Sequence, residues 1–146
     1  MMKHMFIVGL FLISSLTAGC KQQISKVCFD STCVVVEVAQ TPEQLSQGLQ
    51  YREHLDKDKG MIFIFPEPSK ANFWMKNTLI PLDMIWFNSA GEVVYIKKNA
   101  PPCLSGLCPT YGSDELTKYV LEVNAGFTDA YNIGVGDGAQ IKIETK

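Results

Sequence analysis

Apolar and polar residues alternate with a period of two in short blocks along most of the chain. This pattern is typical of strands that have one face in a core and one face in water. Clusters of Asp, Asn, Ser, Gly and Pro between the blocks favour turns. The pattern predicts strands at 27–29, 33–38, 60–65, twice within 73–87, at 92–97, 119–123 and 139–143, and short helices near 42–48 and 127–131.

Prolines set several of the predicted boundaries. Pro66 and Pro68 are expected to end the strand at 60–65, because proline lacks the N–H that a strand ladder needs. Pro81 separates the two central strands for the same reason. The segment 99–115 carries three further prolines and is predicted to be a long loop, a kind of element that is often functional in compact domains.

The first predicted helix has the clearest start signal in the chain. Thr41 can accept a hydrogen bond as the N-cap, Pro42 fits the first helical position, and Gln44 completes a capping box. Gly48 predicts the end of this helix, which is therefore short.

The number and spacing of these elements define the fold class. Seven or eight short strands with two short helices and no repeats predict a mainly β fold, a single compact β-sandwich or a partly open barrel. The chain has 146 residues, of which 47% are hydrophobic and 19% are charged. This is enough material for one domain with a real core.

The N-terminal residues do not follow the strand pattern. Lys3 precedes a continuously apolar run at 5–13, which is shorter than the roughly 20 apolar residues of a membrane-spanning helix. The following Leu16-Thr17-Ala18-Gly19-Cys20 resembles a bacterial lipoprotein lipobox, although Thr17 replaces the usual large aliphatic residue. The resemblance implies cleavage before Cys20 and lipidation of that cysteine. The alternative is an ordinary secretory signal peptide followed by an unrelated cysteine.

These features predict the organisation of the chain: a lipoprotein signal peptide at 1–19, a lipidated tether at 20–25 and a β domain at 26–146. Acyl chains on Cys20 would attach the protein to a membrane. Lys21, by resemblance to lipoprotein sorting signals, favours the outer membrane where the host has two membranes. The protein is thus expected to be exported and anchored in the cell envelope, facing the periplasm.

Four cysteines remain after Cys20, and they form two pairs with identical spacing. Because an exported chain meets an oxidising compartment, Cys28–Cys33 and Cys103–Cys108 are expected to be disulfides. The alternative is a four-thiolate zinc site, but its usual spacing of two to four residues makes the pairs a marginal match. We expect no metal and no cofactor.

The formal net charge is −2 and no basic cluster is present. Nucleic acid is therefore not an expected partner. The expected partners are the membrane, through the acyl chains, and an unknown ligand or protein of the envelope.

The segment 73–87 contains both tryptophans and a short polar island, Lys76-Asn77-Thr78, between two apolar arms. The chain resembles the DUF192 family, also called UPF0127, over nearly all of the mature protein. The matching motifs are Gly48-Leu49 with Arg52, Gly60-Met61, Phe73-Trp74-Met75-Lys76-Asn77-Thr78, Ile80-Pro81-Leu82-Asp83, Ala100-Pro101-Pro102-Cys103, Cys108-Pro109-Thr110-Tyr111, Tyr119-Val120-Leu121-Glu122 and Gly136-Asp137. The resemblance implies a compact, mainly β fold and often an exported protein, but it implies no activity.

The polar island is the centre of the predicted site, because polar groups there converge with aromatic side chains and a cysteine-closed loop. The candidate ligand-binding residues, expected to face the Cys103–Cys108 loop, are Arg52, Trp74, Lys76, Asn77, Thr78, Asp83 and Tyr111. This hypothesis makes the protein a binding or assembly module rather than an enzyme.

Two alternatives remain open. Asp83 and Glu122 could act as paired carboxylates in a hydrolase of envelope glycans, which requires that they face one cleft about 5–9.5 Å apart. The polar residues could instead be purely structural, with Lys76 or Arg52 paired to one of the two carboxylates.

Overall fold

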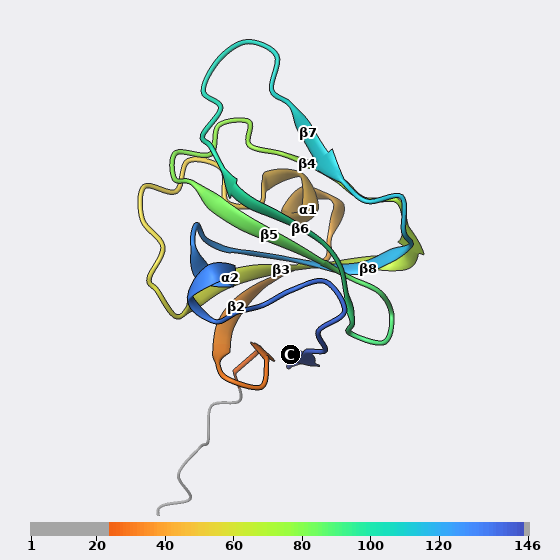
Figure 1. Cartoon of the computed structure of the whole chain (residues 1–146). Helices are drawn as coiled ribbons and strands as arrows, with labels where there is room; N and C mark the ends of the chain where they lie inside the picture. The colour runs from red at the N-terminus through yellow and green to blue at the C-terminus, as the bar shows by residue number, and fades with distance from the viewer. Residues whose placement is uncertain (1–23, 145–146) are drawn as a thin grey trace, which may run out of the picture.

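A curled seven-stranded sheet forms the body of the protein (Figure 1). The structure is a computed structural model that describes residues 24–144. The order of the strands in the sheet is β6-β5-β8-β3-β2-β1-β9, and β4 and β7 form a separate two-stranded sheet. The elements are β1 (Lys26–Cys28), β2 (Cys33–Ala39), α1 (Pro42–Gln47), β3 (Lys59–Ser69), β4 (Asn72–Trp74), β5 (Leu82–Phe87), β6 (Val93–Ala100), β7 (Thr110–Gly112), β8 (Thr117–Asn124), α2 (Phe127–Ala130) and β9 (Gln140–Lys142).

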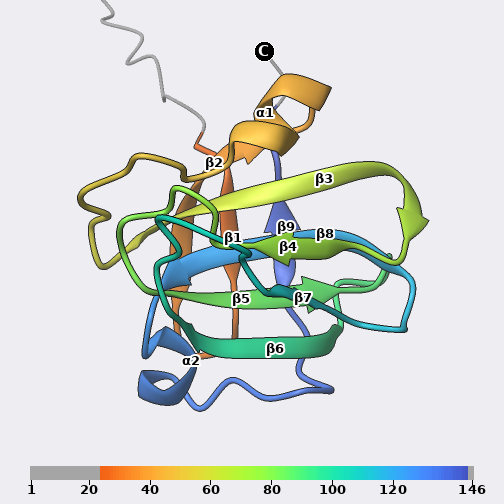
Figure 2. The same ribbon diagram turned by 90° about the horizontal axis from the view of Figure 1, so that it is seen from above.

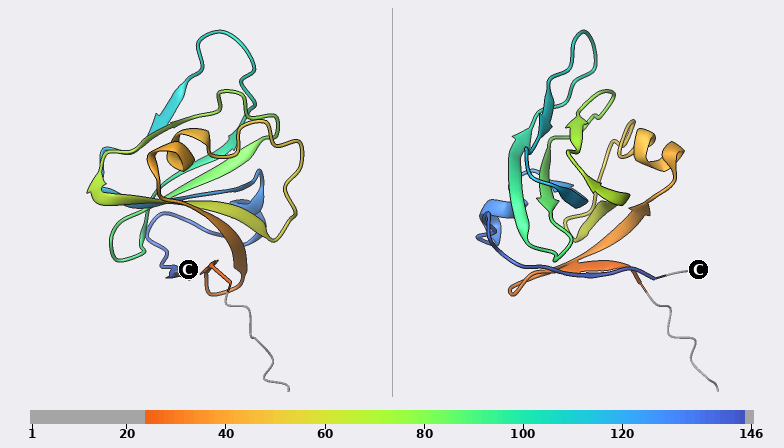
Figure 3. Two further views of the ribbon diagram at one scale, coloured as in Figure 1. Left: turned by 180° about the vertical axis from the view of Figure 1, so that it is seen from behind. Right: turned by 90° about the vertical axis from the view of Figure 1, so that its right-hand side faces the viewer.

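The predicted mainly β fold is confirmed, and its curled sheet corresponds to a partly open barrel (Figure 3). Neighbouring strands are antiparallel except β2 and β3, which are parallel because the connection through α1 returns the chain in the same direction. The described residues contain nine strands rather than seven or eight. The strand missed by the sequence pattern is β7, whose three residues lie in the proline-rich loop and pair with β4 alone.

The strand alternation divides the core between the two faces of the sheet. Ile62, Ile85 and Leu121 point to one face, which α2 covers through Phe127. The other face is covered by α1, β4 and β7, and its buried residues include Met61, Phe63, Met84, Trp86 and Val120. Figure 2 shows α1 beside β2 and β3, and α2 on the opposite side near β6.

The first helix forms as its cap signals predict. The Gln44 backbone N–H donates to Thr41 Oγ1 at 3.3 Å, and the Thr41 N–H donates to Gln44 Oε1 at 3.1 Å. Gly48 ends the helix with a φ of +48°, a conformation that favours glycine. No residue of α1 is buried, so the helix lies on the surface of the domain.

The prediction that Pro66 and Pro68 end their strand is wrong, because β3 continues through both to Ser69. Proline is tolerated there because the neighbouring β2 pairs with β3 no further than Phe63. The ladder with β8 is also irregular between Ile64 and Ser69, so this part of β3 needs few backbone donors.

Both predicted disulfides are present. Cys28–Cys33 closes the β1–β2 hairpin, and Cys103–Cys108 closes the loop before β7. Each cysteine sulfur is bonded to its partner, so the pairs do not supply the thiolates of the zinc alternative. Disulfides indicate that the domain folds in an oxidising compartment. Within residues 24–144, no helix is long and apolar enough to cross a membrane, and the predicted leader and Cys20 lie outside these residues.

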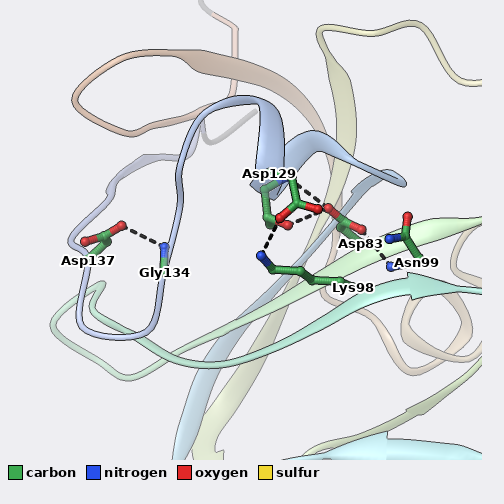
Figure 4. A network of polar contacts seen from close by, with 7 residues as sticks. Asp83, Lys98, Asn99, Asp129, Gly134 and Asp137 are labelled. Atoms are coloured by element: carbon green, nitrogen blue, oxygen red, sulfur yellow. Dashed lines mark hydrogen bonds and ion pairs between the residues drawn. The ribbon is translucent and has the colours of Figure 1, made fainter.

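A buried hydrogen-bond network joins α2 to the sheet (Figure 4). Asp83, on β5, is fully buried and accepts hydrogen bonds from the Asn99 N–H at 2.9 Å, the Thr128 N–H at 2.9 Å and the Thr128 hydroxyl at 2.7 Å. Beside it, Lys98 and Asp129 form an ion pair at the surface. The candidate ligand residue Asp83 is therefore consumed by internal bonds.

We predict that Asp83→Ala lowers the free energy of unfolding by roughly 3 kcal/mol, because it leaves buried donors without an acceptor. The control Lys98→Ala breaks the exposed ion pair and should cost less than about 1 kcal/mol. Urea denaturation measures both. Equal losses for the two variants would contradict the role assigned to Asp83.

Candidate functional site

The polar island forms a tight turn after β4 that is joined to the Cys103–Cys108 loop. Asn77 has a φ of +57°, and the Thr78 N–H closes the turn on the Met75 carbonyl at 3.0 Å. The Asn77 N–H donates to the Cys103 carbonyl at 2.9 Å, and the Cys103 N–H donates to the Met75 carbonyl at 3.3 Å. The disulfide-closed loop therefore fixes the position of the island.

The Asn77 side chain is held by hydrogen bonds to the segment that follows α1. Its amide donates to Tyr51 Oη at 2.8 Å and to Gln50 Oε1 at 3.3 Å. The Tyr51 N–H in turn donates to the Asn77 carbonyl at 2.8 Å. These bonds attach the island to the segment that follows α1, which gives Asn77 a structural role.

A narrow pocket lies between the polar island and the C-terminal end of α1. Its volume is about 30 Å³. Lys76, Thr78 and Trp74 contribute to one side, and Glu122 from β8 lines it from the sheet. The remaining lining residues come from α1 and its exit and from two aromatic side chains: Leu45, Ser46, Gln47, Gly48, Leu49, Gln50, Phe63 and Phe73.

Glu122 is the unusual group of this pocket. Its side chain is on the face of β8 that carries the methionines of the flanking strands, Met61 on β3 and Met84 on β5. The residue is only 5% exposed, and its carboxyl group lines the pocket without a hydrogen-bond donor from residues 24–144. No polar side-chain atom of these residues is both fully buried and unpartnered, so the carboxyl oxygens keep contact with the pocket space. Burial raises the pKa of Glu122 to about 8 from an ordinary value of 4.5. The carboxyl group is therefore predominantly protonated at neutral pH.

Lys76 does not neutralise this carboxyl group. Its ammonium group lies over the Trp74 ring, 5.1 Å from the ring centroid, and both residues are exposed at the mouth of the pocket. Burial is the sole cause of the raised pKa of Glu122, with no offset from a nearby positive charge.

Two larger hollows adjoin the pocket. One, of about 250 Å³, shares the pocket residues Leu45, Phe63, Phe73 and Trp74, and we call it the aromatic hollow. Phe65 and Ala71 also line it, together with the polar side chains of Ser69, Lys70 and Asn72. The other, of about 280 Å³, lies on the far side of Gly48 and is lined by polar side chains of α1 together with the ion pair of Arg52 and Glu37.

The structure brings together some of the predicted site residues and separates others. Trp74, Lys76 and Thr78 line the pocket with Glu122, whereas Arg52 belongs to the polar hollow. Tyr111 is paired with Phe73 in the small sheet, and its ring lies 4.8 Å from Lys97 Nζ.

The paired carboxylates of the hydrolase alternative are not formed. In the β5–β8 ladder, Asp83 is opposite Val123 and Met84 is opposite Glu122. Because successive side chains of a strand point to opposite faces, Asp83 and Glu122 lie on different sides of the sheet. The described residues also contain no group of three or more His, Cys, Asp or Glu side chains placed to hold a metal ion.

Sequence reasoning missed the contribution of α1 and its exit to the pocket. The sequence signal for this contribution was Gly48, which the sequence analysis interpreted only as the residue that ends the helix. A Cβ atom at this position would lie 3.1 Å from the Phe63 ring and 3.9 Å from Glu122 Oε2. Glycine therefore allows the helix end to approach the buried carboxyl group. Glu122 itself was recognisable as a lone acid in the apolar run of β8.

The fold and the site together describe the class of protein: a small domain with a curled β-sheet, in which one acidic side chain, Glu122, lines a pocket next to the surface helix α1. The chain belongs to the DUF192 family, which is described as an uncharacterized ACR and matches residues 25–141. None of the curated proteins matches the chain.

Two solved structures are similar to this chain. A protein of unknown function from Novosphingobium aromaticivorans DSM 12444 has 33% sequence identity and a TM-score of 0.73, with 80% of this chain and 83% of that chain covered. A "putative transcription regulator" from Sinorhizobium meliloti 1021 has 36% identity and a TM-score of 0.72, with 80% and 91% covered. The likeness extends over most of each chain.

We predict that Glu122 makes the domain less stable as pH rises from about 4.5 to 8. Across this range the folded protein keeps a proton that the unfolded chain releases, so the free energy of unfolding falls by up to about 1.4 kcal/mol per pH unit from this group. Glu122→Gln should remove this contribution and be more stable than the parent protein at pH 8. Thermal denaturation at a series of pH values measures the difference.

The exposed Glu67 is a matched control, because it lies on the neighbouring strand β3 outside the pocket. Glu67→Gln should show the same pH dependence as the parent protein. Parallel stability curves for Glu122→Gln and the parent protein would contradict the uncompensated burial of Glu122.

Proposed function

We propose that this protein is an exported, lipid-anchored binding module of the cell envelope, and that its ligand enters the pocket above Glu122. The supporting observation is the Glu122 carboxyl group, which is only 5% exposed, lines the pocket and receives no hydrogen bond from the described chain. Burying such a group without a partner costs stability. Strongly perturbed groups of this kind in a concave site mark functional sites, where a ligand supplies the missing partner.

The pocket favours binding over catalysis. Of its lining residues, only Glu122 and Lys76 have ionisable side chains, and the Lys76 ammonium lies over Trp74 rather than against the acid. General acid–base chemistry with two carboxyl groups would need a second acid on the same face, and Asp83 faces the other side of the sheet. A single protonation site surrounded by aromatic rings fits recognition of a ligand.

Export and anchoring rest on the N-terminal pattern together with the cysteines. Two disulfides are expected of a domain that folds outside the cytoplasm. The lipobox-like sequence ending at Cys20 provides a lipidation site six residues before β1 begins. The short tether would hold the domain close to the membrane surface, where it can capture envelope ligands.

We predict that a thermal-shift screen of envelope glycans, amines and metal ions finds a compound that raises the melting temperature of the protein. A ligand at 100 times its dissociation constant adds about 2.7 kcal/mol to the free energy of unfolding. Trp74→Ala, which removes a half-exposed wall of the pocket, should abolish the shift.

Tyr131→Ala is the matched control for this screen, because Tyr131 is an exposed aromatic residue that follows α2 on the opposite side of the sheet. It should respond to the ligand like the parent protein. A screen without any stabilising compound, or an equal shift in Trp74→Ala, would contradict binding in this pocket.

We predict that the protein purified from its host membrane begins at Cys20 and carries acyl chains there. Intact-mass spectrometry measures both features, and Cys20→Ser should release the domain from the membrane fraction. A chain with its leader intact, or an unmodified Cys20, would contradict the lipid anchor while leaving the pocket unaffected.

A further inference from the structure

We propose, building on the function above, that the ligand is a primary amine on an apolar body, with its ammonium group above Glu122 and its hydrocarbon against Leu45, Phe73 and Trp74. The size, charge and aromatic surroundings of the pocket each contribute to this inference.

The size of the pocket selects a small head group. A hollow needs about 10–15 Å³ to hold one water molecule, and this pocket has about 30 Å³. An ammonium group, with one heavy atom and three donors, is close to water in size. A trimethylammonium group or an intact sugar ring is too large for the pocket in this conformation.

The acid of the pocket selects a cation, because an ammonium group can replace the proton of the Glu122 carboxyl group. Glu122 is buried with Met61 of β3 and Met84 of β5 as its cross-strand neighbours, neither of which titrates. α1 and its exit contribute neutral side chains to the lining, β4 contributes Phe73 and Trp74, and the polar island contributes Lys76 as the other charged group. Because the Lys76 ammonium lies over Trp74, an incoming ammonium would become the direct partner of the carboxylate.

The aromatic surroundings select an apolar body behind the ammonium. Phe63 and Phe73 meet edge to face with their ring centroids 4.8 Å apart, between the pocket and the aromatic hollow of about 250 Å³. Trp74 is 48% exposed and borders both spaces. Aromatic faces attract cations, and the same rings bury hydrocarbon. The two adjoining spaces therefore match a charged head and an apolar tail.

Calorimetric titration of the purified full-length protein with 2-phenylethylamine tests this inference. The matched probes are 2-phenylethanol, which lacks the charge, and trimethyl(2-phenylethyl)ammonium, which exceeds the size of the pocket. We expect the amine to bind at least about tenfold more tightly than either probe, since tenfold corresponds to about 1.4 kcal/mol.

The pH dependence provides an independent readout. Because the ammonium binds the carboxylate form, its affinity should rise by about tenfold per pH unit towards pH 8 and then level off. Titrations at pH 7 in buffers with different ionisation enthalpies should show close to one proton released for each amine bound. Glu122→Gln should remain folded and lose amine binding, whereas Tyr131→Ala should bind like the parent protein.

The inference is overturned if the amine does not bind at millimolar concentration, if 2-phenylethanol binds equally well, or if Glu122→Gln retains the affinity. Failure of the amine inference can be distinguished from failure of the proposed function. A different compound that stabilises the parent protein but not Trp74→Ala would preserve the binding module and exclude the amine as its ligand. The absence of any such compound would exclude both.

Discussion

The burial of one carboxyl group at the centre of the sheet is the constraint on which the site depends. Glu122 lies on β8, the strand between β3 and β5, and its cross-strand neighbours are Met61 and Met84. An apolar side chain would fill the same position without the cost of removing a carboxyl group from water. The protein instead keeps the acid beneath α1, which has no buried residue of its own.

The two buried acids of the domain show how the environment decides the role of a side chain. Asp83 and Glu122 belong to adjacent strands, but the strand alternation directs them to opposite faces. Asp83 accepts three hydrogen bonds and holds α2 to the sheet. Glu122 receives none within the described residues and faces a pocket instead. The first acid is structural, and the second faces the pocket that we propose as a ligand site.

Much of the fold was predictable because local patterns specify it. The capping box at Thr41 and the glycine stop at Gly48 follow from short-range spacing, and both disulfides follow from the spacing of the cysteines together with the expected export. The extent of β3 and the existence of β7 were not predictable, because they depend on which neighbouring strand supplies or omits a partner. Proline rules assume a fully paired strand, and β3 is unpaired on one side beyond Phe63.

The site was predictable in part. The sequence placed Trp74, Lys76 and Thr78 together, since they lie within five residues. The sequence alone could not show that these residues lie beside Glu122 and α1. That arrangement depends on the register of β8 and on the path of the chain after β2. Asp83 was grouped with them through its proximity in sequence, but it faces the other side of the sheet.

The most direct test is a pH titration of the Glu122 carboxyl carbon by ¹³C NMR, with Glu122→Gln to assign the signal. The account predicts a midpoint near 8, and a midpoint near the ordinary value of 4.5 would contradict it.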